Sequence, residues 1–215
     1  LIFFGFGGRD DGWILRAMRA HPTGAAILRE RRPLPPGLLE PERLATLPEG
    51  SLGRAYYEHC RHNDLDPKVI SEESEKVAAE IPATAEHRFI YNRTRDSHDF
   101  WHVLTGYGID MAGEAGIIAW TYGMMRNKAY LLLAVLNALM CTSRGRPDVL
   151  RTAWQGYRYG RRSPQLLAVD WAPHLARPLE EVRAELGLER RPDYPIFHVA
   201  DAPGAPEELP PPSSA

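Results

Sequence analysis

The sequence predicts an all-α protein. We expect a single compact helical domain over residues 1–200, with a metal site between two consecutive helices, and a disordered proline-rich tail over residues 201–215. Apolar residues recur at helical spacing along most of the chain. Alternating apolar and polar stretches are scarce, and no Asn-Gly or Asp-Gly hairpin turn lies between β-rich runs. The final stretch, "DAPGAPEELPPPSSA", has too few apolar residues to form a core.

Composition limits the class of protein. The 215 residues carry a net charge of −2, with 44% hydrophobic and 25% charged side chains, which is ordinary for a soluble globular domain with a substantial core. This balance creates no basic field and argues against nucleic acid as a partner. Cys60 and Cys141 form no CxxC pair, which fits a reducing compartment and argues against a disulfide scaffold or a thiolate zinc site.

Helical segments in the first half can be placed from their caps and breakers. One apolar-faced helix precedes Pro22, and a second begins at a Thr23 cap and ends before Pro33. The four prolines of "PLPPGLLEP" predict a linker. Ser51 is expected to cap the amphipathic helix "SLGRAYYEHCRHN", and "SEESEKVAAEIP" predicts a short, exposed polar helix.

The second half contains the most apolar segments. Residues 117–125 and 129–141 are apolar runs, and neither reaches the ~20 residues that a membrane span needs. We interpret them as two buried core helices, and an alternative is that they also wall a channel for a long apolar ligand. "RPDVLRTAWQGYRYGRRSP" predicts a helix with a basic end. "PLEEVRAELGL" predicts a helix with Pro178 in its first turn and Gly187 as its C-cap.

Three stretches are candidates for contact with a membrane or an anionic group. "LIFFGFGG" at the start is too short to span a bilayer, and we interpret it as the end of a helix or membrane-facing segment. It also fails as a dinucleotide fingerprint, because Asp10 stands where glycine is required. The basic stretches at 29–33 and 158–164 are expected to be solvated faces; the alternative is contact with anionic lipid headgroups or a substrate carboxylate.

The stretch "RDSHDFWHVLTGYGIDMAGEAG" groups two imidazoles and two carboxylates. His98 and His102 are four residues apart, so on a helix they project from one face, and Asp99 lies at its edge. Asp110 is the expected N-cap of the next helix, which carries Glu114. The predicted product is a helix-turn-helix in which His98, Asp99, His102 and Glu114 converge.

Glycines shape this predicted site. Gly106 and Gly108 are expected to end the first helix in a turn. Gly113 and Gly116 flank the glutamate and are expected to let the second helix approach the first closely.

The ligand types favour zinc, and Fe²⁺, Mn²⁺ or Co²⁺ stay open. Mg²⁺ is less suitable because it prefers all-oxygen ligands. The alternative without a metal is an ordinary polar patch in which Asp99 caps a helix or pairs with Arg95. A phosphohydrolase of the HD type is a further alternative. Such a site needs a separate upstream histidine and a distant aspartate, which His87 and Asp110 would have to supply. A second histidine pair, His59 and His62 in "HCRH", has no other ligand beside it, and we interpret it as surface histidines.

The stretch resembles the coenzyme Q (ubiquinone) biosynthesis protein 4 family. The motif of that family is H-D-x-x-H, then eleven residues, then E, and here it is formed without departure by His98, Asp99, His102 and Glu114. The segments "HPTGAAILRERRPL", "LATLPEGSLGRAYYEHC", "HVLTGYGIDMAGEAG" and "GRRSPQLL…DW…PLEEVRAELGL" are similar to family segments in family order. The resemblance covers residues 21–188, and this run of matches is far more specific than the motif alone.

This resemblance implies an all-helical fold and a zinc site made of the four motif residues, which would also serve catalysis. It implies ubiquinone biosynthesis and a carbon–carbon lyase of the 4-hydroxy-3-methoxy-5-polyprenylbenzoate decarboxylase type, coupled to hydroxylation at C1. It also implies a role in organising the other biosynthetic enzymes. The alternatives are a non-catalytic, lipid-binding scaffold with a structural metal and, less favoured, a metal phosphohydrolase.

Partners and location are expectations of the same kind. We expect a polyprenylated aromatic quinone precursor, other ubiquinone-biosynthesis enzymes and peripheral membrane contact, with a homodimer as an open option. Arginine, alanine and proline are abundant, as in bacteria with GC-rich genomes. In a bacterium the location would be the cytoplasm, at the inner face of the membrane; in a eukaryote it would be the matrix side of the mitochondrial inner membrane.

Overall fold

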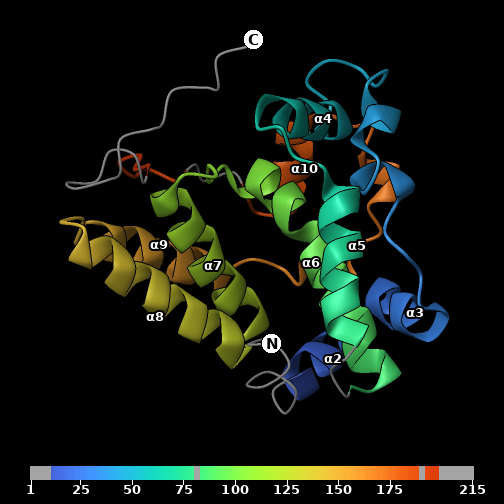
Figure 1. Ribbon diagram of the computed structural model, residues 1–215. Helices are drawn as coiled ribbons and strands as arrows, with labels where there is room; N and C mark the ends of the chain where they lie inside the picture. The colour runs from blue at the N-terminus through green and yellow to red at the C-terminus, as the bar shows by residue number, and fades with distance from the viewer. Residues whose placement is uncertain (1–10, 80–82, 189–191, 199–215) are drawn as a thin grey trace, which may run out of the picture.

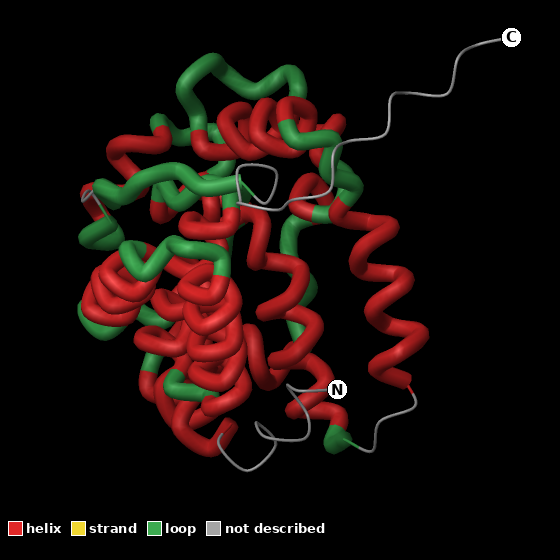
Figure 2. The backbone as a smooth tube through the Cα atoms, turned by 60° about the vertical axis from the view of Figure 1, so that its left-hand side comes forward, coloured by secondary structure: helices red, strands yellow, loops and turns green. Residues whose placement is uncertain are grey.

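The computed structural model describes residues 11–79, 83–188 and 192–198, which form helices joined by turns and loops, with no strand among them (Figures 1 and 2). This confirms the all-α prediction. "LIFFGFGG" and the predicted tail over 201–215 lie outside the described residues. In chain order the α-helices are α2 (Asp11–Ala20), α3 (Pro22–Glu30), α4 (Leu52–His62), α5 (Pro67–Ala79), α6 (Ala85–Thr105), α7 (Met111–Met125), α8 (Lys128–Ser143), α9 (Val149–Gly160) and α10 (Leu179–Glu185).

Two groups of helices make up the molecule. The helices α7, α8 and α9 pack against one another and form the left-hand side of Figure 1. The longest helix, α6, packs against α4 and α5 and touches α7. The short helices α2 and α3 pack together, and α10 lies beside α4. The turn between α6 and α7 therefore joins the two groups, and the predicted site residues lie on the two helices at either side of it.

Most of the predicted helix ends are confirmed, because local chemistry fixes them. The Ser51 hydroxyl accepts a hydrogen bond from the Arg54 amide at 3.3 Å, as an N-cap does. Gly106 follows α6 with a φ of 81°, and Gly187 follows α10 with a φ of 66°, in the left-handed region that glycine adopts readily. The Asp110 carboxylate accepts from the first amides of α7.

Three details differ from the sequence prediction. Thr23 is not a cap, because α3 begins at Pro22 and its N-cap residue is His21. The predicted linker contains one short 3₁₀ helix, Pro36–Leu38, and a second, Pro41–Leu44, begins at its last proline. Prolines can start such helices although they cannot continue an α-helix. The polar helix α5 starts at Pro67, before the "SEESEK" stretch.

Large aromatic side chains fix α6 in the core. The ring of Phe100 makes edge-to-face contacts with Tyr56 of α4 and with Trp171, at centroid distances of 5.3 and 5.0 Å. Trp101 contacts Trp120 of α7 in the same way at 5.5 Å. All five rings are buried, and such pairs are favourable beyond the area that they bury. They hold the turn of α6 on which the predicted histidines lie.

Glycines bring α7 close to α9 rather than to α6. A Cβ atom at Gly156 would overlap the backbone oxygen of Gly116, and one at Gly160 would overlap that of Trp120. The expectation that Gly113 and Gly116 let α7 approach α6 is therefore wrong. These two glycines instead make room for the turn between the helices, since their Cβ atoms would meet Gly108 and the ring of Tyr107.

The two apolar runs have different environments. Residues 117–125 are mostly buried, as predicted. The prediction is wrong for 129–141, because α8 buries an alanine-rich face and leaves larger apolar side chains exposed. The exposed ones are Leu131, Val135, Leu136, Leu139 and Met140. Among the described residues, no helix combines the length and apolar character that crossing a bilayer requires.

Candidate metal centre

The end of α6 is held in place by a buried arginine. Arg183 of α10 donates to the carbonyl oxygen of Leu104 at 3.0 Å and also to that of Val103. Carbonyl groups in the last turn of a helix have no intrahelical partner, so this guanidinium satisfies two of them. The turn that carries His102 is thereby anchored to another part of the chain.

Three motif residues meet at this end of α6, and the fourth, Asp99, lies beside two of them. The Nε2 atoms of His98 and His102 lie 3.3 Å apart. The Glu114 carboxylate reaches across from the first turn of α7, with one oxygen 3.2 Å from His102 Nε2 and the other 3.5 Å from His98 Nε2. One ligand atom of Asp99 lies within 4.8 Å of both histidines. His98, His102 and Glu114 thus meet as predicted, and Asp99 lies beside the two histidines; that the four residues hold one metal stays a prediction.

A backbone carbonyl sets the tautomer of His102. Its Nδ1 lies 3.0 Å from the carbonyl oxygen of Tyr107, which can only accept, so Nδ1 donates. In the neutral imidazole the lone pair is then on Nε2, the atom that faces His98 and Glu114. Metal-binding histidines are commonly oriented by such a bond.

The separations fit a bound cation. The two imidazole nitrogens lie 3.3 Å apart, and each lies 3.2 or 3.5 Å from a different oxygen of the Glu114 carboxylate. Ligands on a tetrahedral zinc ion at about 2.0–2.1 Å are separated by about 3.3 Å. Such atoms repel one another unless a proton or a cation lies between them. The donor set is therefore suited to a divalent metal.

Titration of the cluster reflects the same pairing. Burial alone would raise the pKa of Glu114, but hydrogen bonds and charge from His102 and His98 outweigh it and hold that pKa at about 2. Burial would lower the pKa of His98, but the Glu114 carboxylate, followed by Asp99, outweighs burial and raises it. The carboxylate thus stays ionised and available as a ligand.

Two alternatives from the sequence find no support in these contacts. Arg95 does not pair with Asp99; its guanidinium binds Asp96 at 2.7 Å and Ser71 at 2.7 Å. Asp110 is engaged as the cap of α7, and its other oxygen accepts from the Tyr194 hydroxyl at 2.9 Å. Asp110 is therefore occupied by structural bonds rather than free to serve a phosphohydrolase site.

A further histidine lies at the site. His62 is exposed, as expected, but the prediction of a surface residue is wrong for His59, whose ring stacks on His102 with a centroid distance of 5.9 Å. Burial, followed by the nearby His102 and His62, lowers the pKa of His59 to about 4, although Glu114 opposes this. A signal existed in the sequence, since His59 follows Tyr56 by three residues on the apolar face of its helix.

A cavity of about 590 Å³ opens beside the cluster. His59 and His102 line it, together with the turn from Gly106 to Ile109. It shares no lining residue with an apolar groove of about 430 Å³ between α7, α8 and α9. A third pocket, lined by Arg151, Arg158 and Arg162, shares Tyr107 with the cavity and Trp154 with the groove.

These features define an all-helical protein with a histidine- and carboxylate-lined polar centre. The chain is similar to fungal proteins that are named ubiquinone biosynthesis protein coq4, mitochondrial. The protein from Talaromyces stipitatus is 34% identical to it, and the protein from Penicillium rubens is 32% identical. Each match covers 82% of this chain and 60% of the relative. A sequence profile of the coenzyme Q (ubiquinone) biosynthesis protein Coq4 family matches residues 12–192. The chain belongs to this family, which supports a role in ubiquinone biosynthesis.

The fold is shared with a solved structure. A protein from Nostoc punctiforme PCC 73102, described as a candidate ubiquinone biosynthesis protein, superposes with a TM-score of 0.64 at 21% identity, covering 85% of this chain and 83% of that one. This likeness concerns the fold alone. The chain spans 60% of the length of the curated relatives that it matches.

Proposed function

We propose that this protein is a metal-dependent carbon–carbon lyase of ubiquinone biosynthesis, which removes the C1 carboxyl group of a polyprenylated 4-hydroxybenzoate-type compound. The observation that carries the proposal is the convergence of His98, His102 and Glu114 at distances suited to one divalent ion. Zinc is the favoured metal from the ligand types, with Fe²⁺ as the alternative.

The residues have distinct parts in this proposal. His98, His102 and Glu114 would hold the metal, and Asp99 would complete the set or move a proton. The metal would supply a positive charge that stabilises the negative charge developing as the carboxyl group leaves. The bond from C1 to the carboxyl carbon breaks, CO₂ leaves, and the electron pair stays on the ring. C1 then takes a proton; in the oxidative form, molecular oxygen accepts two electrons and two protons and leaves as hydrogen peroxide, while C1 gains a hydroxyl group from water.

The test is release of labelled CO₂. Zinc- or iron-loaded protein is incubated with 4-hydroxy-3-methoxy-5-prenylbenzoate labelled at the carboxyl carbon. We expect label in CO₂, and a fall of at least about 100-fold for Glu114→Gln, which keeps the size of the side chain and removes the charge. The lyase proposal is wrong if folded protein loaded with zinc or with iron releases no labelled CO₂, both in air and in the absence of air. The scaffold with a structural metal is then favoured. Turnover of p-nitrophenyl phosphate would instead favour a phosphohydrolase.

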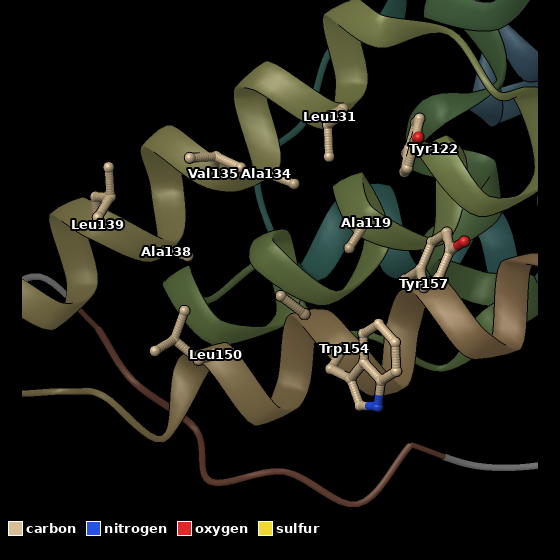
Figure 3. A pocket seen from close by; sticks show the side chains of 11 residues that line it. Ala119, Tyr122, Leu131, Ala134, Val135, Ala138, Leu139, Leu150, Trp154 and Tyr157 are labelled. Atoms are coloured by element: carbon tan, nitrogen blue, oxygen red, sulfur yellow. The ribbon is translucent and has the colours of Figure 1, made fainter.

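We further propose that the face formed by α8 and α9 contacts an anionic membrane. Apolar side chains from both helices line the groove, with Ala119 and Tyr122 of α7 between them (Figure 3). Trp154 at its edge is 60% exposed, and Leu139 59%. The adjoining pocket carries the three arginines, whereas in the 29–33 stretch Arg29 and Arg32 pair with Glu30. Apolar side chains beside cationic ones suit an anionic lipid surface.

Liposome binding checks this contact. Leu136→Glu with Leu139→Glu should weaken binding to phosphatidylglycerol-containing vesicles by at least ~10-fold, because two apolar side chains are lost and two negative charges are gained. The matched control, Val69→Glu with Ile70→Glu, changes two exposed apolar residues of α5 and should bind as the wild type does. An equal loss of vesicle binding in the two double variants would contradict the proposed membrane-contacting face.

Charge reversal in the two basic stretches tests whether the arginines take part in this contact. Arg158→Glu with Arg162→Glu should weaken binding to the same vesicles, since each arginine near an anionic surface contributes about 1 kcal/mol. Arg29→Glu with Arg31→Glu serves as the control and should have little effect. If the 158–162 pair leaves vesicle binding unchanged, the arginine pocket takes no part in membrane contact.

A further inference from the structure

We infer that His59 is a ligand-contacting residue of this centre: its Nε2–H group donates a hydrogen bond to an oxygen atom of the molecule bound in the cavity beside His102. The identity of that molecule, an aromatic acid, rests on the proposed function. The hydrogen bond itself rests on the geometry of α4 and α6.

Asn63 sets the position of the proton on His59. The amide nitrogen of Asn63 donates to the His59 carbonyl oxygen at 2.8 Å and lies 3.3 Å from His59 Nδ1. An amide nitrogen carries only donors, so Nδ1 of His59 accepts. The proton of the neutral ring is then on Nε2, which makes Nε2–H the donor that His59 offers.

That donor has no partner within the described part of the chain. His59 Nε2 is enclosed by protein and makes no hydrogen bond there. A buried donor without an acceptor is unfavourable, so proteins nearly always provide one, either from the chain or from a bound molecule. Nε2 has almost no accessible surface in this structure, so the side chains that cover it must move aside when a molecule binds. An occupant of the cavity that His59 lines can then supply the missing oxygen.

The stacked rings place His59 beside the centre. The planes of His59 and His102 are inclined by 18° to each other, and both rings line the same cavity. His102 Nε2 belongs to the cluster, so a molecule held there by one oxygen occupies the cavity that both rings line. A carboxylate or phenol oxygen is the acceptor that suits this donor.

Two substitutions separate the hydrogen bond from packing. His59→Phe keeps an aromatic ring and removes the donor, whereas His59→Gln keeps an N–H donor. Calorimetric titration of 4-hydroxybenzoate into the zinc-loaded full chain should show about ten-fold weaker binding for His59→Phe and recovery to within about three-fold for His59→Gln. Zinc content should equal that of the wild type in both, and the exposed control His21→Phe should change neither. Unchanged affinity in His59→Phe, or equal losses in both variants, would overturn the inference.

A spectroscopic arm keeps this test separate from the proposed function. Imidazole ¹⁵N resonances of His59 should report the Nε2–H form, and the Nε2 resonance should shift when acetate, a carboxylate without a ring, is added to the zinc-loaded protein. If the wild type binds zinc and acetate but not 4-hydroxybenzoate, the proposed substrate fails and the hydrogen bond stands. An Nδ1–H form, or an Nε2 resonance that acetate leaves unmoved, would overturn the hydrogen bond.

Discussion

Replacing His98 or His102 with alanine should remove the metal and leave the helices in place. Both Nε2 atoms lie within 3.5 Å of the Glu114 carboxylate, so each substitution deletes a ligand atom and leaves the others unable to close the site. Loss of a group that only orients a ligand weakens metal binding roughly 10–100-fold, so loss of a ligand should exceed that range. Elemental analysis of the purified variants measures the metal content, and circular dichroism measures whether the helices are retained.

The comparison of variants makes this result specific. His21→Ala removes an exposed histidine that makes no capping bond and should retain about one metal per chain. Chelation of the wild type should lower its unfolding temperature, since a ligand at 100 times its Kd stabilises by about 2.7 kcal/mol. Binding should also weaken on acidification, because the pKa of His98 is raised and a proton competes there with the metal. A wild-type protein purified and reconstituted without any bound metal would contradict the whole assignment.

The site could be predicted because the forces that build it are local. A spacing of four residues places His98 and His102 on one face of any α-helix. Gly106 and Asp110 end one helix and begin the next through bonds to neighbouring backbone groups. Glu114 then falls in the first turn of the second helix, on the side of the turn where the histidines lie.

Long-range packing explains what the sequence left out. The exposure of α8 depends on which helices cover it, and α7 and α9 cover only its alanine-rich face. Nothing in the spacing of Gly116 indicates that its neighbour is Gly156, forty residues further along the chain. The place of His59 at the site likewise depends on the packing of α4 against α6, which brings together residues 43 positions apart.

The close contact between α7 and α9 leads to the second large expected effect. Gly156→Ala should lower the unfolding temperature by roughly 5–10 °C, because its Cβ atom would overlap the backbone oxygen of Gly116. A flexible side chain can move away from a new methyl group, but a carbonyl in the middle of a helix cannot do so without moving the helix. Differential scanning calorimetry of the purified variant measures the shift.

A second glycine separates this steric effect from helix propensity. Gly12 of α2 is also helical, but a Cβ there meets only the end of the Arg16 side chain, at 3.3 Å. Gly12→Ala should therefore be neutral or stabilising by up to about 1 kcal/mol. An unfolding temperature for Gly156→Ala equal to that of the wild type would contradict the close packing of α7 on α9.

The same substitution should also weaken metal binding. Glu114 is the member of the cluster that α7 contributes, and α9 is the helix on which α7 packs most closely. A displacement of α7 away from α9 changes the position of the Glu114 carboxylate relative to the two imidazoles on α6. Zinc affinity should thus fall in Gly156→Ala and stay unchanged in Gly12→Ala, although neither glycine touches the centre. A destabilised Gly156→Ala protein with wild-type zinc affinity would show instead that α6 and its turn position the metal without help from the packing of α7.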